Sequence, residues 1–195
     1  SSLLPENNQW GAFPSFSAGW VLSEESFWPE SVGSFLSFVK LRGSWGQNGS
    51  LANLRGVWKD YDDFSPYNGI GQFAYLSAVT TEGIRYPLPG GGYITGAEPD
   101  VLANDDLTWE TSQQTDVGVD LTAWDGRISF TVDRFVKTTK DLLAYYDAPA
   151  PAGNDPPFIN SGEVENRGWE FNIGVRNQEK TLNYDLNLNF STLKN

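Results

Sequence analysis

Polar and apolar side chains alternate with a period of two along several stretches of this chain. The clearest stretch is 182–190, which reads Leu182-Asn183-Tyr184-Asp185-Leu186-Asn187-Leu188-Asn189-Phe190. The same alternation appears at 39–45, 116–123, 127–133 and 169–176. Because successive side chains of a strand point to opposite faces of a sheet, these stretches predict strands with one apolar and one polar face.

The connections between these stretches are either very short or very long. We expect six strands, at about 11–21, 37–46, 109–123, 127–139, 167–177 and 181–191. The Asp125-Gly126 pair and 177–181 predict tight turns, whereas 46–107 and 137–166 are long and rich in Gly, Pro, Asn and Asp. Short turns that alternate with long loops are typical of outer-membrane barrels. The predicted fold class is therefore all-β, a segment of an antiparallel transmembrane β-barrel with long extracellular loops.

A β-sandwich would show the same alternation, so the period alone does not decide the fold. The alternative is a soluble or surface-attached β-sandwich that binds carbohydrate through exposed aromatic side chains. The long connections argue against it, because compact soluble domains rarely contain structureless loops of that length.

Composition excludes several classes of function. The net charge is -12, with 13 Lys+Arg against 25 Asp+Glu, so the chain offers no cationic surface for a phosphate backbone, and we expect no nucleic-acid partner. Histidine and cysteine are both absent, which removes Ser-His-Asp and Cys-His nucleophile systems and histidine metal sites from this sequence. The 8 Trp and the 14% of aromatic residues suit a barrel, which places such side chains at both membrane interfaces.

Two groups of carboxylates suggest chemistry, and neither has the pattern that the chemistry requires. Asp60, Asp62 and Asp63 are a weak calcium candidate, because the glycine and the final glutamate of a calcium-binding loop are missing. A solvated acidic loop is the better interpretation. Glu163 and Glu165 would suit a secreted hydrolase only if they faced each other across one bond, and they lie two residues apart on one strand. We therefore expect no enzyme, no catalytic residue and no cofactor.

Five blocks of the sequence resemble, in the same order, the barrel of SusC/RagA-type TonB-dependent outer-membrane transporters of Bacteroidetes. They are 13–25 (FPSFSAGWVLSEE), 39–49 (VKLRGSWGQNG), 104–121 (NDDLTWETSQQTDVGVDL), 125–143 (DGRISFTVDRFVKTTKDLL) and 160–171 (NSGEVENRGWEF). The resemblance implies a wall segment, from the C-terminal half, of a barrel of about 22 strands with a plug in its lumen. It also implies a bacterial outer-membrane location and import of large nutrients, either oligosaccharides or oligopeptides.

The resemblance sets further expectations about partners and domains. The implied partners are a SusD-like surface lipoprotein, the TonB complex and outer-membrane lipid. Residues 1–195 would form part of one β-barrel domain, with the plug, the TonB box and the N-terminal extension outside this sequence. The sequence contains no methionine, which fits a part of a longer protein.

Candidate binding residues lie in the predicted loops, and a separate set of polar residues lies on the predicted strands. Flat aromatic rings with a polar edge can stack on sugar rings or peptide side chains. The loop aromatics that we single out are Trp58, Tyr61, Tyr67, Tyr75, Tyr86 and Tyr93. The alternative is that they pack the loops against each other or against the lipoprotein partner. On the strands, the polar residues expected to face the lumen are Asp116, Asp120, Asp133, Glu170 and Arg176.

Overall fold

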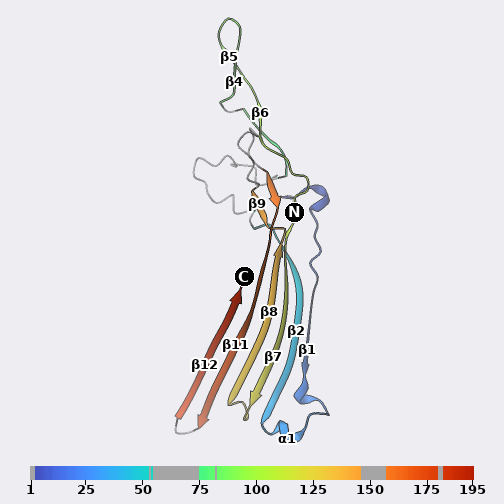
Figure 1. The fold of residues 1–195 in the computed structure, drawn as a ribbon, viewed down its shortest axis with the longest axis vertical. Coiled ribbons are helices and arrows are strands. Elements are labelled where there is room, and N and C mark those ends of the chain that lie inside the picture. The colour runs from blue at the N-terminus through green and yellow to red at the C-terminus, as the bar shows by residue number, and fades with distance from the viewer. Residues whose placement is uncertain (1–2, 53, 55–74, 82, 146–156, 180–181) are drawn as a thin grey trace. The chain divides into compact units, whose positions relative to one another are not determined.

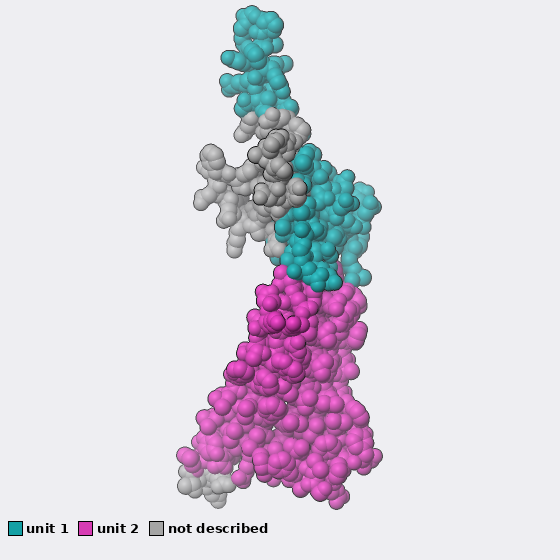
Figure 2. All heavy atoms as spheres, viewed as in Figure 1, with its two compact units in different colours: residues 1–12, 49–111, 140–163 teal, residues 13–48, 112–139, 164–195 magenta. Residues whose placement is uncertain are grey.

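The alternating stretches form the strands of one six-stranded sheet (Figure 1). The computed structural model describes residues 3–52, 54, 75–81, 83–145, 157–179 and 182–195. These residues divide into two compact units (Figure 2). We call 13–48, 112–139 and 164–195 the sheet unit, and 1–12, 49–111 and 140–163 the loop unit.

All six predicted strands are present, and their order in the sheet is their order in the chain. The strands are β1 (Ser15–Val21), β2 (Leu36–Ser50), β7 (Glu110–Ala123), β8 (Ile128–Lys140), β11 (Glu163–Glu179) and β12 (Leu182–Lys194). The first strand begins four residues later than predicted, because Pro14 has no N–H to give to a ladder. The Pro14 carbonyl oxygen still accepts a hydrogen bond of 2.9 Å from the Gln47 N–H. β11 begins four residues earlier than predicted.

One face of this sheet is apolar and open. In the β11–β12 ladder, apolar residues stand opposite one another, in the pairs Phe171↔Phe190, Ile173↔Leu188 and Val175↔Leu186. Leu186, Leu188 and Phe190 are 61%, 69% and 63% exposed. β1 and β2 continue this face with Phe16 opposite Trp45 and Trp20 opposite Leu41. A sandwich would bury such a face against a second sheet, whereas a barrel exposes it to lipid.

The sheet unit also contains the short connections, as predicted. β7 and β8 are joined through Trp124, Asp125 and Gly126, whose φ angles of 49°, 53° and 84° are all left-handed. The Arg127 N–H closes this turn on the Trp124 carbonyl at 3.1 Å. The connection between β1 and β2 contains two short helical segments, η2 (Leu22–Glu24) and α1 (Glu30–Gly33).

The described residues of the loop unit form a 3-10 turn, three short strand pairs and a hydrophobic cluster. The turn is η1 (Glu6–Asn8), and the pairs are β3 (Ala78–Thr80) with β6 (Glu98–Val101), β4 (Arg85–Pro87) with β5 (Tyr93–Thr95), and β9 (Leu143–Tyr145) with β10 (Phe158–Asn160). The cluster buries Leu3, Leu4, Leu51, Leu54, Leu107, Leu143 and Phe158. The Asn160 side chain pairs with the backbone of Thr108, which is 52 residues away in the chain: its Oδ1 accepts from the Thr108 N–H at 2.8 Å, and its Nδ2 donates to the Thr108 carbonyl at 3.0 Å. No helix in the described ranges is long and apolar enough to cross a membrane.

Candidate polar-face site

The second face of the sheet carries a continuous set of polar side chains, and it is the candidate functional surface. In the β11–β12 ladder the apolar pairs alternate with pairs that carry polar side chains. Among these are Glu170↔Ser191, Asn172↔Asn189 and Arg176↔Asp185. Asp116, Asp120 and Asp133 bring carboxylates to β7 and β8, with the side-chain periodicity that the sequence predicted.

Arg42 connects three strands of this polar face. Its Nε donates to Asp120 Oδ2 at 3.1 Å, and its Nη2 donates to Asp133 Oδ2 at 2.7 Å. The hydroxyl of Thr131 donates to the other Asp120 oxygen at 3.0 Å. The side chains of Arg42, Asp120 and Asp133 are 39%, 27% and 17% exposed, so the network is half-buried. One guanidinium from β2 therefore holds carboxylates from β7 and β8.

Gly118 makes this arrangement possible because it has no side chain to occupy the polar face of β7 between Arg42 and Asp133. A Cβ atom at this position would lie 2.9 Å from Arg42 Cζ and 3.1 Å from Arg42 Nε, and it would collide with Asp133 Oδ1. The guanidinium therefore crosses β7 directly over a glycine to reach β8. The expected set of inward polar residues did not include Arg42 or Gly118, although both stand on the polar face of alternating stretches.

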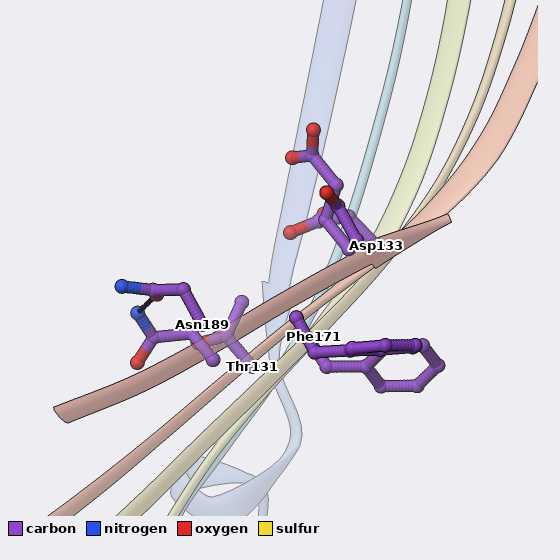
Figure 3. Close-up of a pocket in the computed structure, with 8 residues that line it drawn as sticks. Thr131, Asp133, Phe171 and Asn189 are labelled. Carbon is purple, nitrogen blue, oxygen red and sulfur yellow. Dashed lines mark hydrogen bonds between the residues drawn. The ribbon is translucent and has the colours of Figure 1, made fainter. Parts of the chain in front are cut away.

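A pocket of about 350 Å³ lies next to this network (Figure 3). Its lining residues come from three strands and are Thr131, Asp133, Glu170, Phe171, Asn172, Asn189, Phe190 and Ser191. Figure 3 shows the Asp133 carboxylate and the Asn189 side chain on one side of the strands, with the Phe171 ring on the other. Asn172 Nδ2 donates to Asn189 Oδ1. Asp133 Oδ1 is buried and has no hydrogen-bond partner among the described residues.

Most side chains that line this pocket are polar, and two of them, Asp133 and Glu170, are carboxylates. Carboxylates, amides and hydroxyls can accept hydrogen bonds from polar or cationic groups. The described residues include no group of three or more side chains that could hold a metal ion. Glu163 and Glu165, the other carboxylate pair, lie in separate ion pairs, with Lys140 at 3.7 Å and with Arg167 at 3.5 Å.

The structure separates the predicted loop residues into different environments. Trp58, Tyr61, Tyr67 and the calcium candidates Asp60, Asp62 and Asp63 lie outside the described residues. Tyr75 packs, partly buried, against the hydrophobic cluster of the loop unit. Tyr86 and Tyr93 belong to the β4–β5 pair and are 54% and 68% exposed. The turn that joins these two strands has Gly90, Gly91 and Gly92, all with positive φ.

Replacing Gly118 with alanine is expected to destabilise the complete protein by about 1–3 kcal/mol, because the new methyl group displaces an ion-paired guanidinium and carboxylate. Urea unfolding of the complete protein refolded into lipid vesicles measures this change. In an Arg42→Gln background the same substitution should cost less, since the guanidinium is gone. Equal costs in both backgrounds would show that Gly118 does not serve the Arg42 network.

Comparison with known proteins agrees with this architecture. Residues 3–195 match the family described as "TonB dependent receptor-like, beta-barrel". The chain is 35% identical to a TonB-dependent receptor of Formosa agariphila and 32% identical to the TonB-dependent receptor SusC of Bacteroides thetaiotaomicron, in each case over 98% of its own length. It spans only 16% and 17% of those two proteins.

Solved structures show the same fold. The chain superposes on the RagAB peptide importer in its "open-open" state with a TM-score of 0.74 and 23% identity, covering 99% of this chain and 18% of the other. The superposition on the "closed-closed" state has a TM-score of 0.72. The chain therefore belongs to the TonB-dependent receptor-like β-barrel family and is an outer-membrane protein.

Proposed function

We propose that this chain is a wall segment of a TonB-dependent importer of large nutrients. The observation that carries the proposal is the two-faced sheet, which has an exposed apolar face and a polar face organised around Arg42. A sheet of this kind can separate lipid from a polar lumen. The segment contributes wall and loops, and we assign it no catalytic step.

The substrate class that we propose is oligosaccharide or oligopeptide. The oligosaccharide alternative follows from the resemblance to SusC/RagA-type transporters, and the oligopeptide alternative agrees with the description of RagAB as a peptide importer. The partners that we propose are a SusD-like surface lipoprotein and the TonB complex. All 195 residues then belong to one β-barrel domain, and the plug, the TonB box and the N-terminal extension belong to other parts of the complete protein.

Tyr86 and Tyr93 are the described residues that we propose for substrate contact. Both rings are exposed, on neighbouring strands of the β4–β5 pair. A Cβ on Gly96 would run into the Tyr86 ring, so this ring lies directly over the backbone of Gly96. An exposed aromatic ring that the backbone supports on one side offers its other side for stacking. Trp58, Tyr61 and Tyr67 lie outside the described residues, and we propose them for substrate contact on the basis of the sequence alone.

The test is substrate binding to the complete protein with its lipoprotein partner in detergent. The probes are a set of fluorescently labelled oligosaccharides and a tryptic digest of casein. For whichever probe binds, replacing Tyr86 and Tyr93 with alanine should weaken binding about 3- to 10-fold per ring, as lost stacking predicts. The matched control is Ile94→Ala, which removes an exposed apolar side chain from the same pair of strands without removing a ring.

Uptake tests the import itself. Cells that produce the complete protein should accumulate the bound probe, and deletion of TonB should abolish accumulation. Accumulation that persists without TonB would contradict the proposed mechanism. Equal losses of binding in the tyrosine variants and in Ile94→Ala would contradict the assignment of the two rings.

A further inference from the structure

Three cationic residues gather at one end of the apolar face. In the β11–β12 ladder, Trp169 stands opposite Thr192. Two residues before Trp169 and two residues after Thr192, Arg167 stands opposite Lys194. Side chains two residues apart on a strand share a face. Arg167 and Lys194 therefore lie on the lipid-facing side, next to the aromatic end of the apolar face.

Arg134 joins them from the neighbouring strand β8. Its guanidinium carbon lies 5.4 Å from the centre of the Trp169 ring, close enough for a cation–π contact. Its Nη1 also donates to the carbonyl oxygens of Phe135 at 3.0 Å and Gly168 at 2.8 Å. These contacts use one guanidinium nitrogen and hold the group in place on the apolar side of the sheet.

The cluster carries a net positive charge in a strongly acidic chain. Among the described residues, Glu165 forms an ion pair with the cluster, with its Oε1 3.5 Å from Arg167 Nη1. Three cations and one carboxylate leave two positive charges (3 − 1 = 2), although the whole chain has a net charge of -12. This concentration on the lipid-facing side is opposite to the overall charge of the protein.

Along the strands, the cluster lies away from the tight turns and in the direction of the long connections. β8 runs from the tight turn at Trp124–Arg127 past Arg134 towards the long connection 141–162, and β11 leaves that connection shortly before Arg167. In outer-membrane barrels the short turns face the periplasm and the long loops face the outside. The three cations thus lie towards the extracellular side, beside Trp169, and barrels place aromatic residues of this kind at the membrane interface.

We propose that Arg134, Arg167 and Lys194 form a binding site for the phosphate-bearing headgroup of an outer-leaflet lipid. Guanidinium groups bind phosphate through paired hydrogen bonds, and lysine adds a mobile point charge. The adjoining exposed side chains of Trp169 and Phe190 give the acyl chains of the same lipid an apolar surface, which a soluble anion would not need. The site depends on the outer-membrane location of the chain and is independent of the import proposed above.

The test measures lipid retention by the complete protein in detergent, using purified lipid A with and without its phosphates and native mass spectrometry. The wild-type protein should retain the phosphorylated form preferentially. In the triple variant Arg134→Gln/Arg167→Gln/Lys194→Gln, that preference should fall about 10- to 100-fold, as the loss of three headgroup contacts predicts. The matched control, Lys40→Gln/Lys137→Gln/Arg176→Gln, removes three cations from the polar face and should keep the preference.

Four results would overturn the proposal. They are a wild-type protein that binds both forms of lipid A equally, a triple variant that keeps its preference, a control variant that loses as much as the triple variant, and full displacement of the lipid by millimolar inorganic phosphate. The Arg134 contacts with backbone carbonyls also support the sheet, so a second variant serves if the triple variant fails to fold. In that case Arg167→Gln/Lys194→Gln, which spares those contacts, should still lower the preference, and an unchanged preference would contradict the site.

Discussion

Replacing Leu188 with arginine is expected to lower the stability of the complete barrel by about 2–4 kcal/mol, the cost of a cation at the bilayer midplane. Leu188 is exposed on the apolar face and stands opposite Ile173. This pair lies midway along the ladder between the Trp169↔Thr192 pair and the Asn177↔Tyr184 pair. An arginine there is too far from either interface to place its charge in water easily.

The measurement is urea unfolding of the complete protein in lipid vesicles, together with the fraction of the protein that inserts. The matched control is Asn187→Arg, which introduces the same side chain one residue away on the polar face. We expect the control to insert and to unfold nearly as the wild-type protein does. If both variants were equally destabilised, the assignment of the two faces to lipid and lumen would be wrong.

Replacing Arg42 with glutamine is expected to cost about 1.5–3 kcal/mol, because two half-buried carboxylates lose their charged partner. Asp120 would keep its hydrogen bond from Thr131, whereas Asp133 would keep no partner among the described residues. Fully buried ion pairs cost about 3–5 kcal/mol when one partner is removed. We expect less here, because the Arg42 side chain is more than one-third exposed.

Three further variants separate charge from geometry in this network. Arg42→Lys should recover only part of the loss, because an ammonium group cannot reproduce the planar fork that reaches both carboxylates. Arg42→Gln/Asp133→Asn should recover more, since the stranded charge is removed. Arg176→Gln is the matched control, an exposed arginine whose Nη2 donates to the Gly126 carbonyl, and we expect it to cost little. An equal loss in Arg176→Gln would contradict a special role for Arg42.

The strands could be predicted from the sequence because each of them meets two different environments. Lipid on one side and a polar space on the other require alternation, so 182–190 and 169–176 predict their strands from local pattern alone. The ends of the strands were less certain. β12 continues to Lys194 and β11 begins at Glu163. At these ends polar residues such as Glu165 and Thr192 stand on the face that is apolar along the rest of the strand, so the period no longer distinguishes strand from loop.

The polar network and the core of the loop unit could not be predicted in the same way. The contact between Arg42 and Asp133 depends on which strands are neighbours and on the register across Gly118, and neither is encoded locally. The hydrophobic cluster joins leucines from positions as distant as Leu4 and Leu107. Such a core has no period, because each leucine comes from a different irregular segment.

The order of the strands has a consequence for how such a protein can change over time. Each strand of the six-stranded sheet is hydrogen-bonded to the sheet strands that come before and after it in the chain. The long connections between these strands contribute no hydrogen bonds to the strand pairing of this sheet. Lengthening a loop costs little, about 0.6 kcal/mol for each doubling. Mutation and insertion can therefore remodel the connections while every cross-strand pair is inherited unchanged. A wall of this kind allows its connecting loops to diversify without refolding of the sheet.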